Sequence, residues 1–174
     1  MPRHLLIMRH AKSSWDSEAP NDFDRPLAKR GKKDAPRMGS WLREQGLKPD
    51  YVLSSPAQRA RQTAVKVCRE LGIQEDQINW EPGIYEASLP ALLEILQGCP
   101  PAAQRVLLVG HNPGLELLLA YLCGKATPIL ADGKLLPTGA VAVLIMPADW
   151  QPLRPGCAQL VTITGPRALA DPAS

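Results

Sequence analysis

The stretch LLIMRHAKSS, residues 5–14, joins a buried-strand pattern to a cluster of basic side chains. Its first four residues, Leu5–Met8, are all apolar, as in a strand that is covered on both faces. Arg9 and His10 follow directly, and Lys12 adds another cation. Such an ending is typical either of a strand that reaches solvent or of a functional site. The rest of the sequence indicates which of the two interpretations applies.

Two later apolar runs, residues 51–53 and 106–109, lead into segments with helical periodicity. The apolar residues that share one face of these segments are Ala60, Ala64, Val67, Cys68 and Leu71 after the first run, and Leu115, Leu118, Leu119 and Leu122 after the second. Ser55 and Asn112 are natural N-caps, with Pro56 and Pro113 at the first helical positions. We therefore expect two strand-to-helix turns of the same design.

Helical patterns also cover residues 28–46 and 88–97. Pro36 lies inside the first of these. Proline cannot donate a helical hydrogen bond, so this helix is expected either to kink at Pro36 or to begin near Asp34.

Further strands are expected at residues 77–80, 140–146 and 158–164, the last two joined as a hairpin. Alternating strands and helices predict an α/β fold with a mostly parallel sheet and helices on both faces. We expect residues 1–174 to form a single domain, with a frayed tail at about 168–174.

The bulk composition excludes several classes of protein. A chain of 174 residues with 45% hydrophobic and 21% charged residues fits one globular domain. Its net charge of +3 and 5% aromatic content argue against nucleic-acid binding. The four cysteines form no C-x-x-C pair and are expected to be free thiols. The early apolar run is too short for a signal peptide or a membrane span, so we expect a cytoplasmic protein without a membrane partner.

Polar side chains gather where the expected parallel strands end. Ligands of open α/β sheets bind beyond the carboxyl ends of the strands. The residues delivered there are Arg9 and His10 after the first strand, Arg59 after the second, and His111 with Asn112 after the fourth. Guanidinium groups and free N–H groups at helix starts suit phosphate oxygens, so these residues predict a phosphate site. His4, at the start of the first strand, is expected to lie at the opposite edge.

The two histidines predict phosphoryl transfer at this site. Neighbouring cations disfavour protonation of histidine, so a neutral imidazole is available as a nucleophile. One histidine could accept the phosphoryl group while the other, with the arginines, neutralises charge on its oxygens. A zinc site needs three or four ligands, and no histidine or cysteine pair has suitable spacing. We therefore expect neither a metal nor another cofactor.

Six segments also match a known family. They are LLIMRHAKSSW (5–15), DRPLAKRGKKDAPRMGSWL (24–42), SSPAQRARQTA (54–64), IYEAS (84–88), LLVGHNPGLE (107–116) and PTGAVAVL (137–144). In this order they resemble the histidine phosphatase superfamily, which includes phosphoglycerate mutase-like folds, and within it the SixA-type phosphohistidine phosphatases. The usual Arg-His-Gly reads Arg-His-Ala here, as in a familiar SixA-type variant.

The resemblance implies a role for each matched residue. His10 would be the nucleophile that becomes phosphohistidine, Arg9, Arg59 and His111 would hold the phosphoryl oxygens, and Glu86 aligns with the acid that protonates the leaving oxygen in larger members. In the alternative interpretation, Glu86 is an ordinary loop carboxylate that pairs with a surface cation. Asn112 would contribute backbone N–H groups near the phosphate.

The leading hypothesis is a phosphatase acting on phosphohistidine of a protein partner. Imidazole leaves more easily than an alkoxide, and residues 72–104 are too few to build a lid over the pocket. A phosphatase for small phosphomonoesters such as sugar phosphates is the alternative, and a non-catalytic phosphate-binding module is a third. Arg25 or Lys12 could also steer an anionic substrate, whereas Trp15 and Trp41 are expected to pack in the interior. The oligomeric state is not indicated.

Overall fold

A mixed sheet of six strands, in the order β3-β2-β4-β1-β5-β6, forms the centre of the computed structural model, which describes residues 2–124 and 135–169. The strands are β1 (Arg3–Arg9), β2 (Tyr51–Ser54), β3 (Ile78–Trp80), β4 (Arg105–Gly110), β5 (Val141–Met146) and β6 (Gln159–Thr164). β1 to β4 run parallel, whereas β5 and β6 form the expected antiparallel hairpin at one side. The predicted fold class is confirmed.

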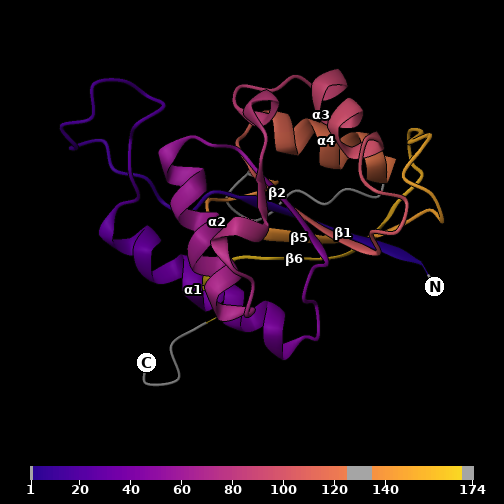
Figure 1. Cartoon of the computed structure of the whole chain (residues 1–174), viewed down its shortest axis with the longest axis horizontal. Coiled ribbons are helices and arrows are strands. Elements are labelled where there is room, and N and C mark those ends of the chain that lie inside the picture. The colour runs from indigo at the N-terminus through magenta and orange to yellow at the C-terminus, as the bar shows by residue number, and fades with distance from the viewer. Residues whose placement is uncertain (1, 125–134, 170–174) are drawn as a thin grey trace.

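Four helices cover both faces of the sheet (Figure 1). They are α1 (Lys29–Glu44), α2 (Gln58–Glu70), α3 (Leu89–Gln97) and α4 (Gly114–Cys123). Alternate side chains of β1 enter two separate cores: Leu6 and Met8 pack with α1 and α2, while Leu5 and Ile7 pack with α3 and α4. Because both faces are buried, the central part of β1, Leu5–Met8, is entirely apolar, as the opening run of the sequence indicates.

The first helix runs without a break from Lys29 through Pro36. The expected start near Asp34 is therefore wrong. A proline in a helix interior removes one backbone hydrogen bond, and the apolar face of α1 compensates by burying Ala35, Met38 and Leu42 completely.

Both predicted N-caps are also wrong. α2 begins at Gln58 after Ala57, and α4 begins at Gly114 after Pro113, in neither case with a side-chain cap. The Ser55 hydroxyl instead accepts the amide N–H of Ala57, and the Asn112 amide donates to the carbonyl of Leu136. These two side chains are thus held in the turns that precede the helices.

The last described residues pack against the domain. Pro166–Ala168 form a short 3-10 turn, and Leu169 contacts the core beneath α1. The rest of the expected frayed tail, 170–174, lies outside the described residues. Within residues 2–124 and 135–169, no helix combines the length and the apolar character needed to cross a bilayer.

Gly31 provides a test of how tightly α1 fits against the loop after β1. A Cβ atom added at Gly31 would lie 2.2 Å from the carbonyl oxygen of Lys12, which is backbone and cannot rotate away. We expect Gly31→Ala to lower the free energy of unfolding by about 1–3 kcal/mol. In the control Gly98→Ala, the added Cβ would lie 3.4 Å from the carbonyl oxygen of Ile95, an ordinary contact, so urea denaturation should show a much smaller loss. Equal losses in the two variants would contradict this close approach.

Candidate active site

A cavity of about 330 Å³ lies at the carboxyl ends of the parallel strands. The residues that line it are Asp22, Arg59, Tyr85, Glu86, Ala87, His111, Asn112, Pro113 and Gly114. His10 lies beside this cavity, with its ring centroid 5.2 Å from that of His111. The structure therefore brings together both predicted histidines, Arg59, Glu86 and Asn112.

Pairing of β1 with β4 places the two histidines side by side. Arg9 is in register with Gly110, and the amide N–H of His10 donates to the Gly110 carbonyl at 3.0 Å. His4, at the other end of β1, is in register with Arg105 and lies away from the site, as expected.

His10 is held as a neutral imidazole with one free nitrogen. Its side chain is buried, and Nδ1 lies 2.7 Å from the carbonyl oxygen of Ala11. A carbonyl oxygen only accepts, so Nδ1 carries the hydrogen and Nε2 keeps a lone pair. Burial, with smaller contributions from His111, Arg59 and Arg9, lowers the pKa of His10 to about 3 against the opposing effect of the Ala11 hydrogen bond. His10 therefore has the properties of a nucleophile near neutral pH.

His111 is oriented by Ser55. Its Nε2 lies 2.8 Å from the Ser55 hydroxyl oxygen, which already accepts the Ala57 N–H, so the hydroxyl hydrogen is available for Nε2. In that tautomer His111 Nδ1 is a hydrogen donor. Burial, followed by the nearby charge of Arg59, lowers the pKa of His111 to about 4. Ser55 was predicted only as a helix cap, because its hydroxyl meets His111 only in the folded chain.

Arg59 is fixed by Asp22, which the sequence analysis did not single out. Arg59 Nη1 donates to the Asp22 carbonyl at 2.7 Å, and Nη2 donates to Asp22 Oδ2 at 2.9 Å. The same Oδ2 accepts the Tyr85 hydroxyl at 2.7 Å, and Oδ1 pairs with Arg25 at 2.7 Å. The Tyr85 hydrogen bond and then the pairing with Arg59 hold the pKa of Asp22 at about 2, so the carboxylate is ionised.

Arg9 approaches the site from β1. Its Nη1 donates to the Leu136 carbonyl at 3.3 Å, and the Asn112 amide donates to the same oxygen at 2.9 Å. The backbone N–H of Leu136 is in turn bound by the Glu116 carboxylate of α4 at 2.9 Å. Arg9 and Asn112 thus bind the carbonyl of Leu136 while Glu116 binds its N–H group, an arrangement that no spacing in the sequence indicates.

Glu86 lines the cavity in an unusual backbone conformation. Its φ of 55° makes it the only residue other than glycine with positive φ among those described. Such residues are uncommon outside functional sites because the conformation costs energy. The side chain is exposed to solvent and hydrogen-bonds to Tyr85. The position of Glu86 is compatible with the predicted role as an acid and does not test it.

Three buried polar atoms of these residues have no hydrogen-bond partner within residues 2–124 and 135–169: Arg9 Nε, His111 Nδ1 and Asn112 Oδ1. Buried polar groups are almost always paired, and those that are not commonly await a ligand. Two of the three atoms, Arg9 Nε and His111 Nδ1, are hydrogen-bond donors, so the ligand that they favour is an anion. Three or more histidine, cysteine or acidic side chains grouped as for a metal ion do not occur in the described residues.

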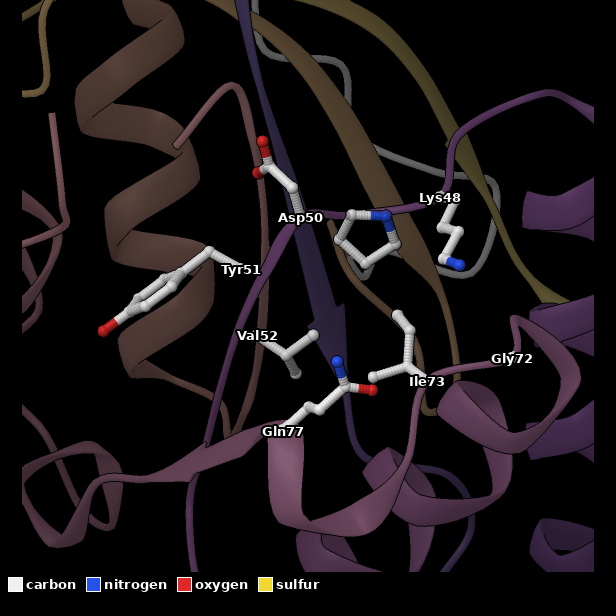
Figure 2. Close-up of a pocket in the computed structure, with 8 residues that line it drawn as sticks. Lys48, Asp50, Tyr51, Val52, Gly72, Ile73 and Gln77 are labelled. Atoms are coloured by element: carbon white, nitrogen blue, oxygen red, sulfur yellow. The ribbon is translucent and has the colours of Figure 1, made fainter. Parts of the chain in front are cut away.

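A second cavity, of about 360 Å³, lies at the opposite end of β2 (Figure 2). Its eight lining residues include neither a histidine nor an arginine. The Asp50 carboxylate among them is already used, since it accepts the backbone N–H groups of Gln104 and Arg105. We therefore place the functional site at the carboxyl ends of the strands.

Comparison with known proteins gives concordant matches. A family model described as the histidine phosphatase superfamily (branch 1) matches residues 5–94. An uncharacterised protein of Mycobacterium tuberculosis is 35% identical over 164 residues, which is 92% of this chain and 100% of the relative. Phosphohistidine phosphatase SixA of Escherichia coli is 31% identical over 131 residues, 71% of this chain and 76% of the relative.

Solved structures of SixA proteins are also similar to this chain. The protein histidine phosphatase SixA complexed with tungstate has a TM-score of 0.80 at 27% identity, covering 96% of this chain and 99% of that one. A phosphohistidine phosphatase SixA structure from Agrobacterium tumefaciens, described as putative, has a TM-score of 0.79 at 29% identity, covering 95% and 99% of the two chains.

The two buried histidines predict a loss of stability in mild acid. The folded chain keeps both imidazoles neutral, with pKa values of about 3 and about 4, whereas an unfolded histidine binds a proton near pH 6.5. The unfolded state therefore binds more protons as the pH falls from about 6.5 toward 4, and the free energy of unfolding decreases over that range.

Urea denaturation between about pH 8 and pH 4.5 measures this slope. His10→Asn and His111→Asn should each flatten it, because each variant removes one titrating group. A slope that is unchanged in both variants would show that other groups cause the acid sensitivity.

Proposed function

Because the chain belongs to the histidine phosphatase superfamily, we propose that it is a phosphatase that transfers a phosphoryl group to His10, and that its substrate is phosphohistidine on a protein. The observation that carries the proposal is the pair of neutral imidazoles, His10 buried and His111 partly buried, with the lone pair of His10 Nε2 left free beside His111.

The reaction has two steps. In the first, His10 Nε2 attacks phosphorus, a new N–P bond forms, and the N–P bond of the substrate breaks with its electron pair passing to the leaving imidazole, which takes up a proton. In the second, water attacks phospho-His10, loses a proton, and releases inorganic phosphate and neutral His10. Each step needs in-line approach and neutralisation of charge on the phosphoryl oxygens.

Arg9, Arg59 and His111 supply that neutralisation. His111 Nδ1 and Arg9 Nε are donors without a protein acceptor, so a phosphoryl oxygen would satisfy them. The Asp22 contacts leave the Arg59 guanidinium fixed at the rim of the cavity before substrate arrives. Preorganised charge of this kind costs little at the moment of reaction.

The leaving group explains why an exposed carboxylate can suffice as the acid. Imidazole is protonated at a pKa of about 6.5, whereas an alkoxide leaving group is far more basic and needs a strong donor. Glu86 lies on the open rim of the cavity, in contact with solvent and Tyr85. Phosphohistidine thus depends less on Glu86 than a phosphomonoester does.

The relatives support the same choice of substrate. The E. coli relative is named a phosphohistidine phosphatase, and the similar SixA structure is complexed with tungstate, a tetrahedral oxyanion like phosphate. The second candidate is hydrolysis of small phosphomonoesters, which is favoured by the presence of Glu86 in the cavity lining. A non-catalytic phosphate-binding module would have no need of the free lone pair on His10.

A substrate panel tests the proposal. Wild type should release phosphate from free phosphohistidine and from a peptide phosphorylated on histidine, with or without EDTA, and acid-sensitive, base-stable phosphate should appear on the enzyme. His10→Ala should lose this label and at least about a thousandfold in turnover. Glu86→Gln should slow phosphomonoester hydrolysis by about a hundredfold or more and phosphohistidine hydrolysis by less.

Each result separates the candidates. Full turnover by His10→Ala would refute the covalent mechanism, and equal losses on both substrates in Glu86→Gln would refute the leaving-group explanation. Phosphate binding without turnover of any substrate would identify a binding module.

Removal of the Asp22 side chain tests the positioning of Arg59. Asp22→Ala deletes both carboxylate contacts to arginine, so kcat/KM for phosphohistidine should fall by about ten- to a hundredfold without loss of folding. Asp24→Ala is the matched control, since Asp24 lies in the same loop and its carboxylate makes no ion pair within the described residues. Similar activity of the two variants would show that Arg59 needs no anchor.

A further inference from the structure

The first two turns of α1 carry lysines that face solvent. Lys29, Lys32 and Lys33 are all exposed; the helical period places Lys29 and Lys33 opposite the buried residues Ala35 and Met38, and Lys32 at the flank of that buried face. No ion pair joins any of the three to another residue in the described chain, and the acid among them, Asp34, pairs with Arg30 and Arg37 instead. A positive surface is therefore left without internal compensation.

These lysines do not stabilise the helix they occupy. The start of a helix carries partial positive charge, so an acidic residue is favoured there and a cation costs about 0.3–1 kcal/mol. The first turn of α1 contains no acidic residue. The concentration of positive charge at this position is therefore not explained by stabilisation of α1.

The lysines adjoin the candidate active site. The amide N–H of Ala28, just before α1, donates to the Lys12 carbonyl at 2.8 Å, and Ser13 pairs with Leu27. Lys12 is two residues after His10. Figure 1 shows the loop between β1 and α1, in indigo, projecting from the same end of the molecule as the start of α1.

An exposed aromatic side chain lies in this loop. Trp15 was expected to pack in the interior, but 75% of it is exposed, whereas Trp41 does pack against the core. The Arg25 guanidinium stacks 3.5 Å from the centre of the Trp15 ring and also pairs with Asp22, which lines the cavity. Trp15 is thus connected to the site through two contacts while most of its surface faces solvent.

We propose that Trp15, Lys29, Lys32 and Lys33 form a docking surface for an acidic protein surface around the substrate's phosphohistidine. This inference rests on the proposed function and adds to it how a protein substrate is recognised. None of the four residues lines the cavity, so a small phosphoester held inside would not reach them. A macromolecule that inserts one phosphorylated side chain would cover them.

The positive charge of this surface indicates what kind of partner it binds. Uncompensated lysines attract an acidic surface, raise the rate of encounter, and disfavour basic partners. Trp15 adds a large apolar contact area, and tryptophan is among the residues that most often dominate binding energy at interfaces. The stacked Arg25 keeps the ring in place at little cost in conformational entropy.

Three peptides of equal length test the surface. Each carries one histidine phosphorylated chemically with phosphoramidate, flanked by glutamates, by serines or by lysines, and free phosphohistidine is the fourth substrate. For wild type in low salt, kcat/KM should be about tenfold higher for the acidic than for the neutral peptide, lowest for the basic one, and the preference should shrink in high salt.

The variant Lys29→Glu, Lys32→Glu, Lys33→Glu should lose or reverse this preference and keep wild-type kcat/KM on free phosphohistidine. Trp15→Ala should lower kcat/KM for all three peptides by several-fold, again without an effect on free phosphohistidine. The charge-matched control is Lys48→Glu, Arg69→Glu, Arg154→Glu, whose residues are exposed cations at the far end of the sheet. Val161→Ala, at another exposed apolar residue, controls for Trp15.

The outcomes distinguish the two proposals. If wild type hydrolyses free phosphohistidine but shows no preference among the peptides, or if the control triple variant loses the preference equally, the docking surface is refuted and the phosphatase stands. If neither free phosphohistidine nor any of the three peptides is hydrolysed, the proposed function itself fails.

Discussion

The parallel pairing of β1 with β4 is the constraint on which the candidate site depends. Arg9 in register with Gly110 sets His10 and His111 on neighbouring strand ends, where their rings lie 5.2 Å apart. A shift of one residue would turn every side chain of β1 to the other face of the sheet. Both faces are buried, with Leu5 and Ile7 in one core and Leu6 and Met8 in the other, so such a shift is strongly disfavoured. Packing far from the reacting atoms thus fixes their geometry.

That geometry concentrates positive charge in a partly buried place. Two arginines lie beside two imidazoles, and burial together with these charges keeps both imidazoles neutral. Asp22 compensates Arg59 from a loop rather than from the core, and it remains half exposed. The unpaired donors on Arg9 and His111 are left for an anion. The neutral imidazoles result from burial and from the neighbouring guanidinium groups, and the same partly buried site contains the two unpaired donors.

The sequence analysis found the residues that follow strand ends and missed the contacts made by residues in loops. Apolar runs followed by Arg9, His10 and His111 located the site because parallel strands end at one edge of a sheet. Asp22 could not be found in this way, since nothing in its spacing indicates that it would meet Arg59, Arg25 and Tyr85. Ser55 was assigned to a cap because serine before proline usually serves one, yet its hydroxyl orients His111. Trp15 was predicted to be a packing residue rather than a binding platform, yet most of it is exposed and its ring stacks on Arg25 at the surface.

The loop between β1 and α1 therefore links the outer surface to the chemistry. Arg25 stacks on Trp15 and pairs with Asp22, and Asp22 in turn holds Arg59. A partner that covers Trp15 would exclude water from the Arg25 pair, and charge pairs strengthen when water is removed. Docking would then tighten the support of Arg59 at the moment when the phosphoryl group enters. A small phosphoester, which cannot cover Trp15, would be bound by the same residues without that gain, so under the proposed docking the loop would favour protein substrates through the support of Arg59 as well as through binding.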